Sequence, residues 1–341
     1  MNAKERVYAA VRGRPCDRTP RTPIFMAWAA HFIGRTYRDY YLDGDVLVQA
    51  QLAVAEAFGL DQVMAISDPW REASGYGMEF DYPEEGVGIP RGRLIESPED
   101  VRRLRRIDID AAPRMRQRVE SVAKIAASVG RTHSVLGWVE GPIAEYADLR
   151  GVQETMFDLV DEPAMFHDAA AIIVENAIAF ARAQIEAGAD MIGVGDAAAS
   201  LIDAAMFEEF VLPWQRKLFE GIHAAGATVK LHICGNTNHL LPHLARTGAD
   251  IIDVDWMVPL AQARETVGAD VALCGNFDPS GVLLQGSPQA VAQAARQCIR
   301  DGGQRFLLMP GCEVPPRHAR AEHPGVLRRL LTRPPRRPRS G

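Results

Sequence analysis

Residues 228–236 read TVKLHICGN, an apolar β-type run that ends in a polar turn. Side chains two residues apart on a strand project to the same side, so His232 and Cys234 point together from the end of this run. Gly235 follows and allows the backbone to turn sharply beside them. The stretch therefore predicts a buried strand that presents an imidazole and a thiol at its carboxyl end.

The same succession of an apolar run and a polar turn recurs along the chain, with helical segments in between. Helical apolar spacing is clearest over residues 46–58, 113–129, 163–187 and 288–301. Alternation of strands and helices is typical of a parallel sheet, and eight such units are typical of a closed barrel. Eight strands are expected, centred near residues 24, 63, 137, 192, 231, 252, 272 and 307.

The sequence thus predicts the α/β class, as a single (β/α)8 TIM barrel over residues 1–331 with an N-terminal helical extension. The extension is expected at residues 2–13, and the first strand at 22–27 (TPIFMA). Residues 71–95 are rich in Gly, Pro and acidic residues, which predicts an inserted hairpin. Residues 332–341 are Pro- and Arg-rich and predict a disordered basic tail.

Composition excludes several classes of protein. The chain has 341 residues and a net charge of −6, which argues against a broad basic surface for nucleic acid. No apolar run reaches the roughly 18–20 residues of a membrane span, and the N-terminus has no apolar signal segment. Five cysteines are few and odd in number, which favours reduced thiols over a disulfide framework. A cytoplasmic location is therefore expected.

Barrel enzymes place their sites at the carboxyl ends of the strands. His232, Cys234 and Cys312 lie at two such ends, and two thiolates with one imidazole form a three-ligand zinc site with an open fourth position. The alternative is a buried cysteine and a core histidine without metal. Acidic or amide groups end the other strands, although some of them are expected to cap helices instead: Asp68, Glu140, Asp196, Asp255, Asn276, Asp278 and Glu313.

Several motifs resemble those of the uroporphyrinogen decarboxylase superfamily over nearly the whole chain. They are CDRTP at 16–20, EGP at 140–142, FEEF at 207–210 with Pro213, LHICGNT at 231–237, TGAD at 247–250, GNFDP at 275–279 and PGCEVPP at 310–316. The HICGNT and GCEVPP segments resemble the corrinoid-dependent methyltransferase branch. Because the matching His, Cys and Cys bind zinc there, the resemblance implies that His232, Cys234 and Cys312 do so here.

One segment departs from the true decarboxylases of this superfamily. Those enzymes carry an arginine-rich segment near the N-terminus that holds the carboxylates of a tetrapyrrole. The corresponding residues 26–34 read MAWAAHFIG, without Arg or Lys before Arg35. An apolar segment cannot neutralise several buried carboxylates, and burying them unpaired is costly.

The resemblance therefore implies a zinc-dependent methyltransferase that works with a cobalamin-carrying (corrinoid) partner protein. The small substrate is either a thiol acceptor or a methoxylated or methylated donor, and Glu140, Asp196 or Asp255 would orient ligands or manage protons. Trp28 and His31, with neighbouring aromatic residues, are expected on the substrate side, together with Asp68 and Asn276. The alternatives are a metal-free decarboxylase and a non-catalytic subunit of a methyltransferase system. The sequence does not identify the methyl donor, the methyl acceptor, the direction of methyl transfer or the fourth zinc ligand. It also leaves the oligomeric state open, with a homodimer as one of the alternatives.

Overall fold

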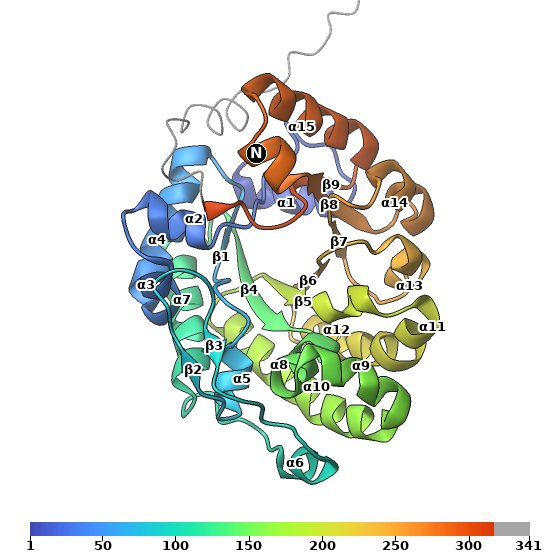
Figure 1. The fold of residues 1–341 in the computed structure, drawn as a ribbon. Coiled ribbons are helices and arrows are strands. Elements are labelled where there is room, and N and C mark those ends of the chain that lie inside the picture. Colours follow the sequence, from blue (N-terminus) through green and yellow to red (C-terminus); the bar gives the residue numbers. More distant parts are fainter. Residues whose placement is uncertain (317–341) are drawn as a thin grey trace, which may run out of the picture.

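The computed structural model describes residues 1–316, so the predicted tail at 332–341 and the end of the predicted domain lie outside the described residues. Within residues 1–316, seven parallel strands follow one another in chain order around a curled sheet (Figure 1). They are β1 Gln62–Met64, β4 Ser134–Glu140, β5 Met191–Gly195, β6 Thr228–Ile233, β7 Ile251–Val254, β8 Ala272–Phe277 and β9 Phe306–Pro310. The predicted α/β barrel class is confirmed.

The predicted first strand at 22–27 is wrong as a strand. Residues 20–22 instead lie between β9 and the start of β1 and join them by a single bridge, Arg21 to Leu308. The amide of Thr22 donates to the carbonyl of Leu308 at 3.1 Å, and Asp61 N donates to the carbonyl of Arg21 at 2.9 Å. Pro20 and Pro23 have no amide hydrogen to donate, so the ladder cannot extend further.

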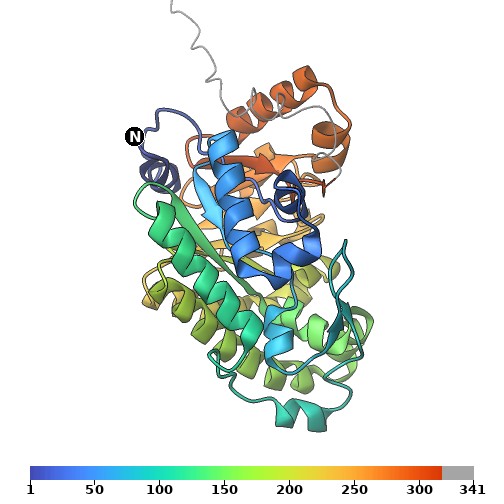
Figure 2. The ribbon, with the colours of Figure 1, turned by 90° about the vertical axis from the view of Figure 1, so that its left-hand side faces the viewer.

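Helices cover the outside of the sheet, as Figures 1 and 2 show. Several helices begin with proline at the first helical position. Helix α4 ends at its C-cap residue Gly59, which has φ 60°. Gly151 (φ 96°) separates two consecutive helices, at residues 142–150 and 152–161. The bounds are α1 Ala3–Val11, α2 Ala27–Phe32, α3 Tyr37–Leu42, α4 Gly44–Phe58, α5 Arg71–Gly75, α6 Pro98–Arg103, α7 Pro113–Val129, α8 Pro142–Arg150, α9 Val152–Asp161, α10 Pro163–Glu186, α11 Ala204–Met206, α12 Leu212–Ala224, α13 Leu241–Leu244, α14 Leu260–Val267 and α15 Pro288–Gly302.

The inside of the curled sheet is filled at its amino-terminal end. Alternate strand residues such as Met191 and Ile251 form one buried cluster with Val7 and Val11 of α1. Helix α1 is held at the strand starts, since Tyr8 Oη donates to the carbonyl of Asp190 at 2.7 Å. This packing leaves the carboxyl ends of the strands as the accessible mouth.

Two further segments are relevant to the mouth and to the helical layer. The predicted insertion begins with α5, and only its middle forms the antiparallel hairpin of β2 (Phe80–Asp81) and β3 (Ile89–Pro90). Helix α10 is the one described helix whose length and hydropathy fit a membrane span, with 56% of its most apolar window buried. It packs on α8, α12 and β4, as a core helix does.

Candidate metal centre

Three potential metal ligands meet over the mouth of the barrel. His232 lies on β6 and Cys234 just beyond it, while Cys312 follows β9. The His232 Nε2 atom is 3.0 Å from the Cys234 Sγ atom, and the two sulfurs of Cys234 and Cys312 are 3.7 Å apart. The Cys312 Sγ atom is 3.8 Å from the same Nε2. Two strands separate β6 from β9, so the predicted juxtaposition from two sides of the mouth is present.

Two of these three distances fit a zinc ion, while the 3.0 Å between His232 Nε2 and Cys234 Sγ is that of a direct hydrogen bond. A tetrahedral zinc bonded at about 2.3 Å to sulfur and about 2.0–2.1 Å to nitrogen separates two sulfurs by about 3.8 Å, and sulfur from nitrogen by about 3.5 Å. The sulfur–sulfur distance of 3.7 Å and the Cys312–His232 distance of 3.8 Å lie close to these values. Two thiols and an imidazole are also the donor set that zinc prefers. The three side chains therefore suit zinc with one position open.

A buried charge pair fixes the orientation of His232. The β6–β7 register places Asp253 directly opposite His232, and its Oδ2 is 3.1 Å from the His232 Nδ1 atom. The same oxygen is 3.2 Å from the ammonium of Lys230, whose side chain is 1% exposed. Nε2 is thereby turned toward the sulfurs. A carboxylate on the second ring nitrogen is the usual support of a metal-binding histidine.

Sequence reasoning missed Lys230 and Asp253, although a signal was present. Both are charged residues in otherwise apolar strands, and Lys230 is two residues before His232 and therefore on the same side. A buried charge is costly unless it is paired, so a lysine at an interior position requires a partner. The acid at the matching position of the next strand is Asp253.

Protons are shared within the cluster of thiols and imidazole. The hydrogen bond from Cys234, together with His232, lowers the pKa of Cys312 to about 4, and the same bond raises the pKa of Cys234. Burial acts to lower the pKa of His232, but the neighbouring Cys234 and Asp253 raise it well above its ordinary value. Binding of a metal would displace these protons, because thiolate and neutral imidazole are the binding forms.

Glycines bring the two cysteine loops together. Gly235 has φ 91°, and its amide donates to the Asp255 Oδ2 atom at 2.9 Å. A Cβ at Gly311 would lie 2.3 Å from the backbone nitrogen of Trp256, so only glycine allows this approach. Asp255 also accepts from Met257 N at 3.2 Å, and it therefore supports the loops beside the cluster.

A cavity of about 450 Å³ opens beside the metal-ligand cluster. Its size is that of a site for a small molecule. Glu140, Asp196 and Asp68 line it, as predicted for groups at the carboxyl ends of strands. The hairpin between β2 and β3 contributes Glu85 and Val87.

Glu140 and Asp196 differ in how their carboxyl groups are held. The indole of Trp138 donates to the Glu140 Oε1 atom at 2.9 Å, and burial raises the pKa of Glu140 well above its ordinary value. Asp196 accepts from Ala144 N at 2.8 Å and from Gln215 Nε2 at 2.7 Å. Burial raises the pKa of Asp196 to about 7. Asp196 thus links β5 to α8 and α12 while it faces the cavity.

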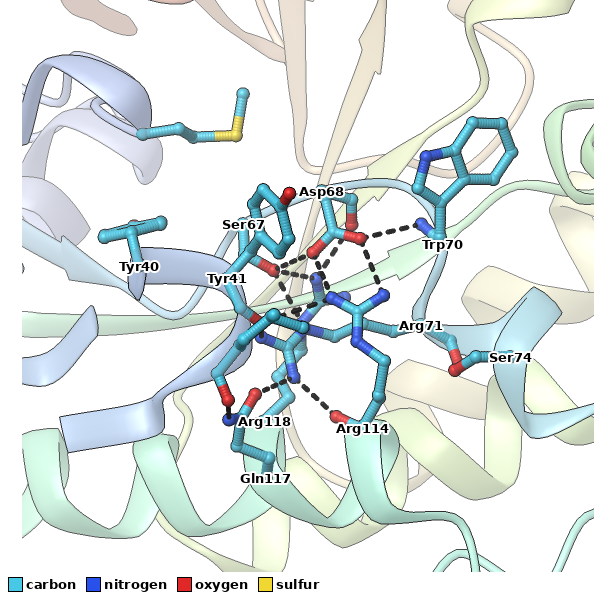
Figure 3. Close-up of polar contacts among 12 residues, drawn as sticks. Tyr40, Tyr41, Ser67, Asp68, Trp70, Arg71, Ser74, Arg114, Gln117 and Arg118 are labelled. Atoms are coloured by element: carbon cyan, nitrogen blue, oxygen red, sulfur yellow. Dashed lines mark hydrogen bonds and ion pairs between the residues drawn. The ribbon is translucent and has the colours of Figure 1, made fainter. Parts of the chain in front are cut away.

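Asp68 faces the cavity from an arginine network (Figure 3). Its two carboxylate oxygens accept from the Arg114 guanidinium at 2.7 and 2.9 Å. The Ser67 hydroxyl donates to Oδ1 at 2.8 Å and accepts from Arg71 and Arg118 at 2.8 and 3.1 Å. Burial acts to raise the pKa of Asp68, but Arg114 and Arg71 outweigh it and lower this pKa.

Three predicted substrate residues do not line the cavity. Trp28 is buried in an aromatic cluster with Phe25, Phe32 and Phe58, at ring-centroid distances of 5.0–5.4 Å. Asn276 is used structurally, since its amide donates to the carbonyl of Val258 at 2.6 Å. These placements correct the predicted direct contacts with substrate.

His31 is the third of these residues, and it acts through a cavity residue. Its Nε2 atom lies 2.9 Å from Oε2 of Glu85, which does line the cavity. Glu313, one of the acidic groups expected at the strand ends, lines the cavity next to Cys312. It accepts from Ala27 N at 3.0 Å, and burial raises its pKa to about 8.

Comparison with known proteins places this geometry in a family. The family model "Uroporphyrinogen decarboxylase (URO-D)" matches residues 2–323. The chain is 27% identical to a methylcobamide:CoM methyltransferase MtbA of Methanosarcina acetivorans, over 91% of this chain and 92% of that protein. It is 28% identical to a uroporphyrinogen decarboxylase of Nostoc punctiforme, over 86% of each. Both activities therefore occur among relatives of nearly equal identity.

A solved structure shows the same fold. The methyltransferase from Methanosarcina mazei superposes with a TM-score of 0.82 at 23% identity, covering 97% of each chain. This likeness agrees with the barrel described above. The chain belongs to the uroporphyrinogen decarboxylase (URO-D) family.

Proposed function

We propose that this protein is a zinc-dependent methyltransferase that moves a methyl group between a corrinoid protein and a small substrate. The observation that carries the proposal is the cluster of His232, Cys234 and Cys312, whose ligand atoms lie within 4.8 Å of one another. All three residues line the cavity, so an ion held there would have its open side toward a ligand. The methyltransferases among the relatives support this choice.

The three ligands and their supports would hold the ion in a fixed position. A bound zinc would supply Lewis acidity, which activates a thiol or polarises the oxygen or nitrogen that carries a methyl group. Asp253 keeps the His232 ring turned toward the sulfurs. Asp255 supports the loop after Cys234 through its contact with Gly235.

Glu140 is suited to manage the proton of this reaction. Burial raises its pKa, which favours the protonated carboxyl group, and Glu140 lines the same cavity as the metal ligands. The indole of Trp138 fixes one of its oxygens. In this proposal the protonated Glu140 gives its proton to the oxygen or nitrogen that loses its methyl group to the corrinoid. When the methyl group moves from the corrinoid to a thiol, the carboxylate form of Glu140 receives the proton of that thiol. Asp196 holds the wall in position.

The partner in this proposal is a corrinoid-binding protein whose cobalamin carries the methyl group. Its cofactor has to approach over the mouth, because the inside of the sheet is filled at the other end. A uroporphyrinogen decarboxylase activity is less well supported. The segment that is arginine-rich in those enzymes contributes only Met26 and Ala27 to the cavity. A carboxylated tetrapyrrole would need cations there.

The test combines metal analysis with methyl transfer. Protein purified without chelator is expected to hold about one zinc per chain, and a Cys234→Ser, Cys312→Ser double variant is expected to lose it. Cys16→Ser is the matched control, because Cys16 is a free thiol outside the cavity. Methyl transfer is then assayed with methylcobalamin and thiols, and with reduced cobalamin and methoxy aromatics. Zinc-free protein without transfer in either direction, even after zinc is offered, would contradict the proposal.

A further inference from the structure

The wall of the cavity is acidic without being cationic. Among residues 1–316, five carboxyl side chains line it, and no lysine or arginine does. The acids come from β4, from the loops after β1, β5 and β9, and from the β2–β3 hairpin. They are Asp68, Glu85, Glu140, Asp196 and Glu313. Away from the metal-ligand cluster, a negatively charged group in this cavity would therefore meet carboxyl groups and no lysine or arginine of residues 1–316.

The buried cations near the mouth are directed away from the cavity. Arg114 reaches Asp68 from α7, so that the carboxylate lies toward the cavity, while Arg71 and Arg118 converge on Ser67 (Figure 3). Lys230 is bound to Asp253. None of these four cations lines the cavity. Their charge balances the protein's own acids rather than that of a ligand.

Each of the five acids also has a partner within the protein. Asp68 is paired with Arg114, Glu85 lies 2.9 Å from His31, and Glu140 accepts from Trp138. Backbone or amide donors serve the other two acids, Asp196 and Glu313. Because every carboxyl group is engaged, none is left as a dedicated counterion for a cationic ligand.

The remaining wall is largely apolar. It includes Ile24, Met26, Ile66, Val87 and Trp138. A ligand bound here exchanges water for these side chains, which favours uncharged surface. An anionic group would lose its hydration without meeting a lysine or arginine of residues 1–316. An ammonium group would meet only carboxyl oxygens that the protein's own donors already engage. In both cases the lost hydration is costly.

We propose that this cavity selects a small uncharged ligand, so that the part of the substrate remote from the transferred methyl group carries neither a sulfonate or carboxylate nor an ammonium group. The inference rests on the proposed function, since it names the substrate class of the same site. An uncharged methyl ether or an uncharged thiol belongs to this class. Organic acids with the same reactive group are disfavoured.

The test compares probes of similar size that differ in charge. The thiols are 2-mercaptoethanol, 2-mercaptoethanesulfonate and 2-mercaptoethylamine. The ethers are 4-methoxybenzyl alcohol, 4-methoxybenzoate and 4-methoxybenzylamine. Affinity for the zinc-loaded protein is measured by calorimetry, which needs no turnover. The uncharged member of each set is expected to bind at least about tenfold more tightly than either ion.

Two variants separate the wall's charge from differences among the probes themselves. Val87→Lys places a cation at the edge of the cavity, whereas Ile89→Lys places one on the same hairpin outside it. Val87 is 44% exposed and Ile89 is 58% exposed, so both variants should fold. Val87→Lys is expected to shift the ratio of sulfonate to alcohol affinity toward the sulfonate by several-fold. Ile89→Lys is expected to leave the ratio unchanged.

The outcomes distinguish this inference from the proposed function. A sulfonate, carboxylate or amine that binds the native protein as tightly as its uncharged counterpart would overturn the inference, even if zinc and methyl transfer are present. An unchanged ratio in Val87→Lys would overturn it as well. Loss of zinc binding or of all methyl transfer would instead contradict the proposed function.

Discussion

Two aspartates at the mouth, Asp253 and Asp68, are each paired with a buried cation but have different roles. On the metal-ligand side, Asp253 lies between Lys230 and His232, and the imidazole is the group that reaches the cavity. On the substrate side, Asp68 lies between Arg114 and the cavity, and this buried aspartate is itself part of the cavity wall. The same type of ion pair thus orients another side chain in one region and forms the wall in the other.

The largest effect is expected from breaking the metal-ligand pair. Asp253→Leu leaves Lys230 buried without a partner, so we expect the free energy of unfolding to fall by about 3–5 kcal/mol. Asp253→Asn should weaken zinc binding about 10–100-fold, because His232 loses its orienting carboxylate. Denaturant titration and competition with a zinc chelator measure the two effects.

A double variant provides the control for this prediction. Adding Lys230→Met to Asp253→Leu removes the unpaired charge and should recover much of the lost stability, because apolar replacements of buried pairs are often tolerated. Zinc affinity should stay low, since the carboxylate is still absent. Full zinc affinity in the Asp253 variants would show that this pair does not orient His232.

The second effect concerns Asp196, which joins the two regions through β5. Burial raises its pKa from 3.8 to about 7, so the folded chain binds a proton that the unfolded chain releases. The free energy of unfolding therefore falls as pH rises from about 4 to about 7, by up to about 4 kcal/mol. Asp196→Asn should remove this component, which denaturant titrations from pH 4 to 8 measure. An identical slope in variant and native protein would be inconsistent with the shift.

The third effect comes from the substrate-side pair. Arg114→Leu leaves the Asp68 carboxylate without its bidentate partner, and we expect a loss of about 2–3 kcal/mol of stability, because Arg71 and Arg118 still attract this carboxylate. Zinc content should be unchanged, which separates this region from the Asp253 region. Reduced zinc content in folded Arg114→Leu protein would mean that the two regions are not independent.

The smallest effect is expected from His31, which joins α2 to the hairpin. Its contact with Glu85 is solvent-accessible, so His31→Ala should cost less than about 1 kcal/mol. Thermal unfolding measures this change, and Trp28→Ala is the contrast. Removing the buried Trp28 ring from its aromatic cluster should cost about 3–5 kcal/mol. Similar losses in both would contradict the placement of Trp28 in the core.

The three metal ligands could be predicted because they follow local rules, whereas the supporting pair of Lys230 and Asp253 was missed. The period of two on a strand places His232 and Cys234 together, and glycines mark where the loops turn. The substrate side follows from tertiary packing. Arg114 comes from a helix whose arginines could equally face solvent, and nothing in the sequence pairs it with Asp68. Trp28 was predicted at the mouth because aromatic residues suit a ligand, but packing with Phe58 decides its place.

The barrel itself was largely predictable, because its strands and long helices also follow local sequence patterns. Apolar runs and helical spacing located seven strands and the long helices within a few residues. The predicted first strand at 22–27 was wrong, because two prolines limit residues 20–23 to a single bridge. That bridge depends on the register with Leu308.

X-ray absorption at the zinc edge of the purified protein identifies the atoms that bind the metal. If His232, Cys234 and Cys312 hold the ion, the spectrum will show two sulfur neighbours at about 2.3 Å and nitrogen or oxygen neighbours at about 2.0–2.1 Å. The Asp253→Asn variant should keep the same neighbours at lower occupancy. A shell of oxygen and nitrogen alone, or zinc retained in the Cys234→Ser, Cys312→Ser double variant, would contradict the account.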